Sequence, residues 1–311
     1  MTSWRARDIP DLTGRRAIVT GANSGFGFQT ALELTRHGAA VLMTSRRRDA
    51  GDDAVRRVRD AVPNAEVSGG LLDLADLDSV REFAAANEAP IDILVNNAGV
   101  MAIPPRLTAD GFEMQLGTNH LGHFALTGLL LPDLLARPGA RVVTVSSSMH
   151  RAGEINFDDL MGEQSYRPWQ AYSQSKLANL LFMRELDRRV REAGLDLLSV
   201  AAHPGYAVTN LQSVGPRMAR RRLTGAVMRF ATSVLGQSAA NGALPQLYAA
   251  TAPGVEGGDY YGPRGVGEQR GLPKKVSMSA NARDDTAALR LWEQSALLTG
   301  VQFAALQPKS Q

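Results

Sequence analysis

The sequence predicts an α/β fold in which helices cover both faces of one parallel sheet, the doubly wound arrangement, within a single domain. Short apolar runs alternate with longer segments of helical periodicity along most of the chain. The runs are almost continuously apolar, as expected of parallel strands that are buried on both faces. Right-handed crossovers between such strands then place helices on the two sides of the sheet.

The expected strands are short runs rich in Val, Ile and Leu, except for the last, which is a short segment with two tyrosines. In chain order they are 16–21, 39–45, the end of 65–74, 91–99, 140–147, 195–205 and 257–262. Strands of this kind need a helical crossover to run parallel to one another, and the intervening segments are long enough to supply it.

Helices are expected in those intervening segments, where apolar residues recur with helical spacing. They are 27–38, 52–62, 77–88, 111–135, a helix that carries Tyr172 and runs to 192, and 237–251. Gly38 ends the first of them, because glycine adopts the left-handed conformation that closes a helix. No linker splits the chain, so residues 1–311 are taken as one domain.

The composition is that of a soluble globular protein, with 44% hydrophobic and 21% charged residues among 311. The net charge of +3 is too small to indicate a nucleic-acid partner. Cysteine is absent, which excludes disulfides and thiolate chemistry and fits a cytoplasmic protein. Neither a secretory signal nor a run of 18 apolar residues is visible, so a membrane span is not expected.

A glycine-rich stretch, TGANSGFG (20–27), lies between the first strand and the first helix. Gly21, Gly25 and Gly27 permit a tight turn and a close approach of phosphate to the backbone. The helix start adds unpaired N–H groups and the positive end of the helix dipole. An ordinary glycine turn would look similar, but the strand before and the helix after it favour a dinucleotide site of the Rossmann type.

The end of the second strand, MTSRRR (43–48), bears on the cofactor. Ser45 occupies the position where an acid would receive the ribose hydroxyls of NAD, and Arg46 follows it. A guanidinium donates two hydrogen bonds to phosphate and is always charged. We therefore predict NADP(H), with Arg46 as the main partner of the 2′-phosphate and Arg47 assisting; NAD(H) is the alternative, and a solvated basic run is the competing explanation.

Together with NNAG (96–99), and with serine, tyrosine and lysine in the right order, these motifs resemble the short-chain dehydrogenase/reductase family. The resemblance covers about residues 12–262. DGFEMQLGTNHLGHFALTGLLLP, VSSSMH and the insert 153–170 are most similar to its retinol-dehydrogenase-like members. The resemblance implies a set of cofactor-binding residues: Gly21, Asn23, Ser24, Gly25, Phe26, Gly27, Ser45, Arg46, Asp73, Leu74, Asn97, Ala98, Gly99, Tyr172, Lys176, Pro204, Gly205, Ala207 and Thr209.

The same resemblance implies four catalytic residues. Tyr172 would exchange the proton, Lys176 would tune its pKa and hold the nicotinamide ribose, Ser147 would orient the substrate oxygen, and Asn119 would anchor a proton relay. A free tyrosine has a pKa near 10, too high for ready exchange near neutrality. An ammonium at about 4 Å contributes roughly 4 kcal/mol at an effective dielectric of about 20, so Lys176 is expected to lower the pKa of Tyr172 toward 7.

Several assignments stay open at this point. Ser146 and Ser148 compete with Ser147, a helix N-cap competes with the cofactor role of Asp73, and Trp169 belongs either to the site wall or to the core. The pair His120 and His123 lacks a third ligand and a metal motif, so no metal is expected.

The expected substrate is a small or apolar carbonyl or alcohol. Residues 211–236 are expected to form a lid over it, with the basic stretch 217–230 in the lid rather than on a membrane, and 264–311 a C-terminal extension. Its segment 282–303 is expected to pack on the body, with a homo-oligomer contact as the rival. A sugar-nucleotide epimerase or dehydratase, a light-driven pigment reductase and a non-catalytic NADP-binding regulator are the alternative functions.

Overall fold

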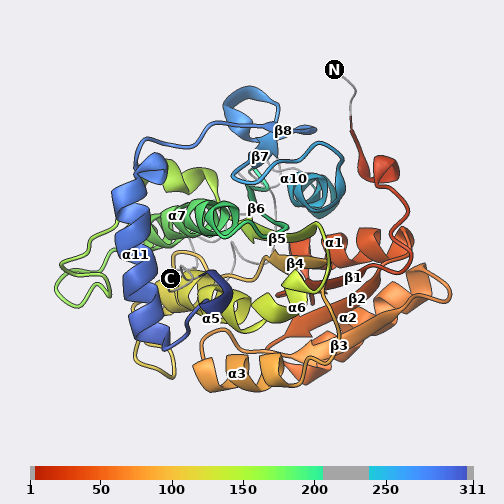
Figure 1. The fold of residues 1–311 in the computed structure, drawn as a ribbon, viewed down its shortest axis with the longest axis horizontal. Helices are drawn as coiled ribbons and strands as arrows, with labels where there is room; N and C mark the ends of the chain where they lie inside the picture. The colour runs from red at the N-terminus through yellow and green to blue at the C-terminus, as the bar shows by residue number, and fades with distance from the viewer. Residues whose placement is uncertain (1–3, 206–237, 307–311) are drawn as a thin grey trace, which may run out of the picture.

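The computed structural model describes residues 4–205 and 238–306. The expected lid 211–236, including 217–230, and the cofactor residues Ala207 and Thr209 lie outside these ranges. Within them, eight strands form one sheet in the order β3-β2-β1-β4-β5-β6-β7-β8, parallel except for β8 (Figure 1). The doubly wound α/β fold predicted from the sequence is confirmed.

The strands of the first half are β1 (Arg16–Val19), β2 (Ala40–Ser45), β3 (Val67–Leu71) and β4 (Ile93–Asn96). Val19 of β1 lies opposite Met43 of β2 on one side and Val95 of β4 on the other. The strand order reverses between β1 and β4, so the chain leaves these two strands in opposite directions. This divergence opens a crevice at their carboxyl ends, where doubly wound folds bind ligands.

The remaining strands are β5 (Ala140–Val145), β6 (Leu197–Ala202), β7 (Tyr260–Pro263) and β8 (Pro273–Lys275). The sequence did not predict β8, a short antiparallel edge strand of polar character. It pairs with β7 through a turn that contains residues 264–272. The third expected strand also ends earlier than predicted, at Leu71, since Leu72 and Asp73 already belong to the loop that crosses the sheet edge.

Two helical layers cover the sheet (Figure 1). One contains α1 (Gly25–Arg36), α2 (Arg48–Ala61) and α10 (Ala239–Thr251), whose buried side chains share one apolar cluster. The other contains α3 (Leu77–Ala85), α5 (Gly122–Leu129), α6 (Leu131–Leu135) and α7 (Pro168–Glu192). Among the described residues, no helix combines the length and apolarity needed to cross a bilayer.

The long helix expected at 111–135 is broken into pieces. After α4 (Met114–Leu116) comes a π-helical turn at Gly117–Leu121, and then α5 and α6 follow with a break at Leu130. Asn119 sits inside the π-turn. Apolar periodicity alone does not reveal this π-helical turn, because the residues on its buried face remain apolar when one extra residue is inserted.

The C-terminal helix α11 (Asp285–Thr299) packs on the outer side of α7 and α5, as Figure 1 shows in blue. Trp292 is buried against Phe124, Phe182 and Phe303, with ring centroids 4.5 to 5.9 Å from its own. The prediction that this segment packs on the body is therefore confirmed. Leu289 on the same helix is the exception, with 40% of its surface exposed.

Candidate active site

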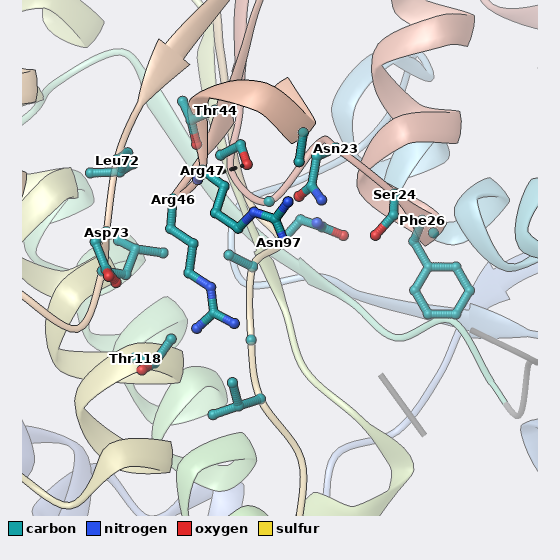
Figure 2. A pocket seen from close by; sticks show the side chains of 18 residues that line it. Asn23, Ser24, Phe26, Thr44, Arg46, Arg47, Leu72, Asp73, Asn97 and Thr118 are labelled. Carbon is teal, nitrogen blue, oxygen red and sulfur yellow. Dashed lines mark hydrogen bonds between the residues drawn. The ribbon is translucent and has the colours of Figure 1, made fainter. Parts of the chain in front are cut away.

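A pocket of about 380 Å³ opens at the carboxyl ends of β1 to β4 (Figure 2). Its lining residues are Gly21, Asn23, Ser24, Gly25, Phe26, Thr44, Ser45, Arg46, Arg47, Ala50, Leu72, Asp73, Leu74, Asn97, Ala98, Gly99, Val100 and Thr118. The sequence named most of this set. It gave no role to Thr44, Ala50, Leu72, Val100 and Thr118, which contribute surface to the pocket.

The glycine turn approaches the β4 loop too closely for a side chain. Gly21 has φ +62°, and a β-carbon on it would lie 2.9 Å from the backbone of Ala98. Gly25 also has positive φ, at +59°, where it begins α1. Within the described chain the N-cap residue Ser24 makes no capping hydrogen bond through its side chain, and Gly25 and Phe26 at the start of α1 line the pocket, so the first N–H groups of α1 are available to an anion there.

Gly27 lies behind the pocket rather than in its lining. A β-carbon on Gly27 would lie 2.5 Å from Nδ2 of Asn97 and 2.6 Å from the carbonyl oxygen of Gly21. This glycine therefore lets α1 pack against the turn and the β4 loop. The third glycine of the motif shapes the site indirectly.

Thr20, buried at the end of β1, holds the NNAG loop in place. Its Oγ1 accepts hydrogen bonds from the N–H groups of Asn97 at 2.8 Å and Ala98 at 2.9 Å. With both lone pairs occupied, the hydroxyl proton is directed to Nε2 of His123, 2.9 Å away. Nothing in the sequence distinguishes Thr20, since a threonine at a strand end is common in any sheet.

The arginines at the end of β2 extend over the pocket (Figure 2). Arg47 pairs with Asp49, and its backbone N–H donates to Oγ of the buried Ser45 at 3.2 Å. Arg46 lines the pocket and forms no ion pair with any described residue. Ser45 therefore stabilises the turn that carries both arginines. It also occupies the position at which an acidic side chain would repel a phosphate.

Asp73 is not the N-cap of α3. That role belongs to Asp76, whose carboxylate accepts from the N–H groups of Asp78 and Ser79. Oδ1 of Asp73 accepts from the N–H of Ala75 at 3.0 Å, and the side chain borders the pocket. The competing structural explanation for Asp73 is thus wrong.

Tyr172 and Lys176 both point inward from α7 and are buried. The ammonium of Lys176 donates to the carbonyl oxygen of Val145 at 3.1 Å and lies 5.8 Å from the centroid of the Tyr172 ring. Burial raises the pKa of Tyr172 to about 12, which the Ser147 side chain partly opposes. Burial also lowers the pKa of Lys176 to about 8.

The expected lowering of the tyrosine pKa toward 7 is wrong for this structure. A pKa lowered to 7 would require an ammonium aimed at the phenol from about 4 Å. Lys176 instead points at a backbone carbonyl, and the cost of removing both groups from water exceeds their mutual influence. Tyr172 is therefore protonated at neutral pH.

Ser147 is distinguished from its neighbours by its environment. Ser146 is buried and donates its hydroxyl to the carbonyl oxygen of Lys176 at 2.7 Å, while Ser148 is exposed. Ser147 is half-buried, interacts with the Tyr172 side chain and begins the 3₁₀ turn Ser148–Ala152. Of the three serines, Ser147 is the one whose hydroxyl faces the tyrosine.

Asn119 is fully buried and ties the π-turn to the loop after NNAG. Its Oδ1 accepts from the N–H of Val100 at 2.8 Å, and its Nδ2 donates to the Val100 carbonyl and to Oγ of Ser175, each at 2.9 Å. A β-carbon on Gly99 would lie 2.9 Å from Oδ1 of Asn119 and 3.6 Å from Nζ of Lys176. Gly99 thus keeps these two side chains beside the pocket.

The two histidines of this helix are structural. Burial lowers the pKa of His123 to about 4 and that of His120 to about 3, so both are neutral. His123 donates from Nδ1 to the backbone oxygen of Asn119 at 3.1 Å and accepts from Thr20, which links the π-turn to the NNAG loop. Across residues 4–205 and 238–306, no group of three potential metal ligands converges.

The remaining predicted residues follow β6 or stand beside Tyr172 on α7. Pro204 and Gly205 follow β6, and Gly205 has φ +70°. Trp169 is 45% exposed and meets the Tyr172 ring edge-on, with centroids 6.2 Å apart. This position favours the site wall over the core for Trp169.

Comparisons with known proteins agree with this geometry. The family described as short chain dehydrogenase matches residues 15–218. Human retinol dehydrogenase 14 is 40% identical over 315 aligned residues, which cover 96% of this chain and 90% of that protein. Human retinol dehydrogenase 13 is 41% identical, in an alignment that covers 95% of this chain and 88% of that protein.

Solved structures are similar as well. A crystal structure of an uncharacterised protein from Mycobacterium paratuberculosis is 45% identical, with a TM-score of 0.80 over 97% of this chain and 99% of that one. The Pseudomonas aeruginosa RhlG/NADP active-site complex is 27% identical, with a TM-score of 0.61 over 80% of this chain and 94% of that one. The resemblance inferred from the motifs is confirmed: this chain belongs to the short-chain dehydrogenase family, as a retinol-dehydrogenase-like oxidoreductase that acts on CH–OH groups.

Proposed function

We propose that this protein uses NADP(H) to interconvert a carbonyl and an alcohol on an apolar substrate, with Tyr172 as the proton donor and acceptor. One observation carries the proposal. A glycine-lined pocket edged by arginines lies on β1 to β4, and a half-buried serine after β5 and a buried tyrosine and lysine on α7 follow along the same sheet. A dinucleotide lying along that sheet would reach both regions.

The pocket has the features that an NADP(H) molecule needs. The close contact at Gly21 and the open start of α1 would receive the diphosphate through backbone N–H groups. Arg46, which has no ion-pair partner among the described residues, would pair with the 2′-phosphate, and Arg47 would join by exchanging Asp49 for the phosphate. Asp73 and Leu74 would flank the adenine. The bound NADP in the RhlG complex supports the same choice.

The chain's own groups would manage the proton. Bound NADPH would supply the hydride that reduces the carbonyl carbon. Ser147 would donate a hydrogen bond to the substrate oxygen and orient it, and Tyr172 would give that oxygen its proton. Because burial holds the pKa of Tyr172 near 12, the phenol carries the proton that carbonyl reduction requires. Lys176, largely protonated below pH 8, would compensate the phenolate that remains.

The relatives and the site wall support the proposed substrate class. The similar proteins named retinol dehydrogenases support an apolar alcohol and aldehyde pair. Trp169 offers an exposed aromatic face beside Tyr172, suited to an apolar chain or ring. Retinal and simpler apolar aldehydes are therefore the first substrates to try.

Labelled cofactor tests the proposal directly. NADPH carrying tritium at the transferable position of the nicotinamide is incubated with the enzyme and a panel of apolar, polar and sugar carbonyls. We expect tritium in the alcohols formed from apolar carbonyls, with little transfer from NADH. Tight NADPH binding without transfer to any member of the panel would contradict the proposal and favour a non-catalytic NADP-binding protein.

A further inference from the structure

The turn between β7 and β8 reaches back to the loop that follows β6. Glu268 in this turn accepts a hydrogen bond from Nε2 of His203, at 3.1 Å. The other ring nitrogen, Nδ1, accepts from the N–H of Gly205 at 3.2 Å. Since Nδ1 is an acceptor, the proton of the neutral ring sits on Nε2. His203 is almost fully buried, so Glu268 fixes both the orientation and the tautomer of a ring that holds the Pro–Gly turn.

The same carboxylate also holds the segment after Ser147. Arg151 lies in the 3₁₀ turn that Ser147 begins, and its Nη2 donates to both oxygens of Glu268, at 3.1 and 3.3 Å. That nitrogen also donates to the carbonyl oxygen of Ser277 at 2.8 Å, beyond β8. Glu268 therefore joins the loop after β5 to the loop after β6.

A second histidine strengthens this connection. His150 donates from Nδ1 to the carbonyl oxygen of Ser147 at 2.6 Å, and its Nε2 accepts from the N–H of Ser279 at 3.3 Å. Its tautomer is thus the opposite of that of His203. Burial lowers the pKa of His150 to about 4, which keeps the ring neutral and both bonds intact.

The backbone is shaped for these contacts. A β-carbon on Gly262 of β7 would lie 2.0 Å from Nε2 of His203, and one on Gly205 would lie 2.5 Å from the carbonyl oxygen of Gln269. Glu268 itself has φ +56°, a conformation unfavourable for any residue with a β-carbon. Such strain persists only where the surroundings enforce it, and it is concentrated at functional sites.

We propose that Glu268 is a positioning residue, which acts through His203 and Arg151 to hold the Ser147 and Gly205 turns at a fixed separation. The inference rests on the proposed function, which gives Ser147 the substrate oxygen, and on the family resemblance, which implies that Gly205 contacts the cofactor. The pocket that would bind the rest of the cofactor lies on β1 to β4, away from Glu268. We therefore expect loss of Glu268 to affect turnover more than cofactor affinity.

The test compares Glu268→Ala and Glu268→Gln with Gln269→Ala, an exposed neighbour in the same turn. We expect Glu268→Ala to lower kcat about tenfold, because a small misplacement of reacting groups is costly, and to change the Kd for NADPH by less than that factor. Glu268→Gln keeps an acceptor for His203 and restores most of kcat. Gln269→Ala behaves like the wild type.

A second readout does not depend on catalysis. Nitrogen NMR of histidine side chains reports the tautomers, and we expect His203 with its proton on Nε2 and His150 with its proton on Nδ1. In Glu268→Ala, His203 loses this preference and the amide of Gly205 exchanges faster with solvent. Unchanged tautomers, unchanged exchange and wild-type kcat in Glu268→Ala would overturn the inference. If the wild type reduces no carbonyl, the proposed function fails, and the tautomer and exchange data still decide the role of Glu268.

Discussion

The two halves of the candidate site are built differently. The pocket on β1 to β4 is made of backbone: Gly21 and Gly25 at positive φ, the open start of α1 and the NNAG loop. The half on β5, α7 and β6 is made of buried ionisable side chains, above all Tyr172 and Lys176. The first half is therefore suited to binding by shape and charge, and the second to proton chemistry.

This difference has a practical consequence. Changes in the backbone-built half should alter the affinity for cofactor, while changes in the other half should alter turnover at saturating cofactor. A variant in the backbone-built half that lowered turnover at saturating cofactor, or one in the other half that weakened cofactor binding, would show that the two halves do not act as separate binding and chemical regions.

The largest effect is expected in the chemical half, from Tyr172→Phe. The substitution keeps the ring, its contact with Trp169 and its burial, but it removes the proton donor. We expect kcat to fall about a thousandfold, within the range of general acid catalysis, with the Kd for NADPH unchanged. Steady-state kinetics and fluorescence titration measure the two quantities. A fall smaller than tenfold would remove Tyr172 from its proposed role.

Arg46→Ala probes the charge of the binding half. Loss of a charge-assisted contact with phosphate should weaken NADPH binding about tenfold to a hundredfold and leave NADH binding unchanged. Arg48→Ala is the matched control, since Arg48 belongs to the same run of three arginines but does not line the pocket. Equal losses for NADPH and NADH would show that Arg46 does not read the 2′-phosphate.

Gly21→Ala probes the shape of the binding half. The added methyl would meet the Ala98 backbone at 2.9 Å, so the NNAG loop must move. We expect the Kd for NADPH to rise about tenfold, which corresponds to about 1.4 kcal/mol. Gly14→Ala is the control: Gly14 has φ +79° with nothing within 4 Å of a β-carbon, so it reports backbone strain alone. A variant Gly21→Ala with normal affinity and reduced stability would mean that the contact is only structural.

The smallest effect is a pH dependence of stability from Lys176. Burial lowers its pKa from 10.5 to about 8, so between these values the unfolded chain binds more protons than the folded one. Stability should therefore rise with pH between about 8 and 10, by about 1–2 kcal/mol. Above pH 10 the raised pKa of Tyr172 acts in the opposite direction. Urea unfolding of the wild type and Lys176→Met should show the rise only in the wild type.

Much of the binding half could be predicted, because its signals are local. A glycine turn between a strand and a helix, and a serine and an arginine after the next strand, are visible in a few consecutive residues. Thr20 and Gly27 were harder, since their importance comes from contacts with Asn97, which lies more than 65 residues away.

The chemical half was predicted in its residues but not in its electrostatics. Tyr172 and Lys176 were recognised from the resemblance to the short-chain dehydrogenase/reductase family. Their pKa values depend on burial and on the direction in which Lys176 points, and neither can be read from an i, i+4 spacing. The β7–β8 turn was missed for a similar reason: a polar strand and a glutamate between glycines carry no periodic signal, and their partners His203 and Arg151 are distant in sequence.

A crystal structure of the protein with NADP⁺ and an alcohol substrate tests the central claim most directly. We expect the adenosine and diphosphate in the pocket on β1 to β4, the 2′-phosphate at Arg46, and the substrate oxygen about 3 Å from the hydroxyls of both Tyr172 and Ser147. The alcohol carbon should face the nicotinamide. A nicotinamide that points away from Tyr172, or a substrate oxygen beyond hydrogen-bond reach of the phenol, would contradict the account.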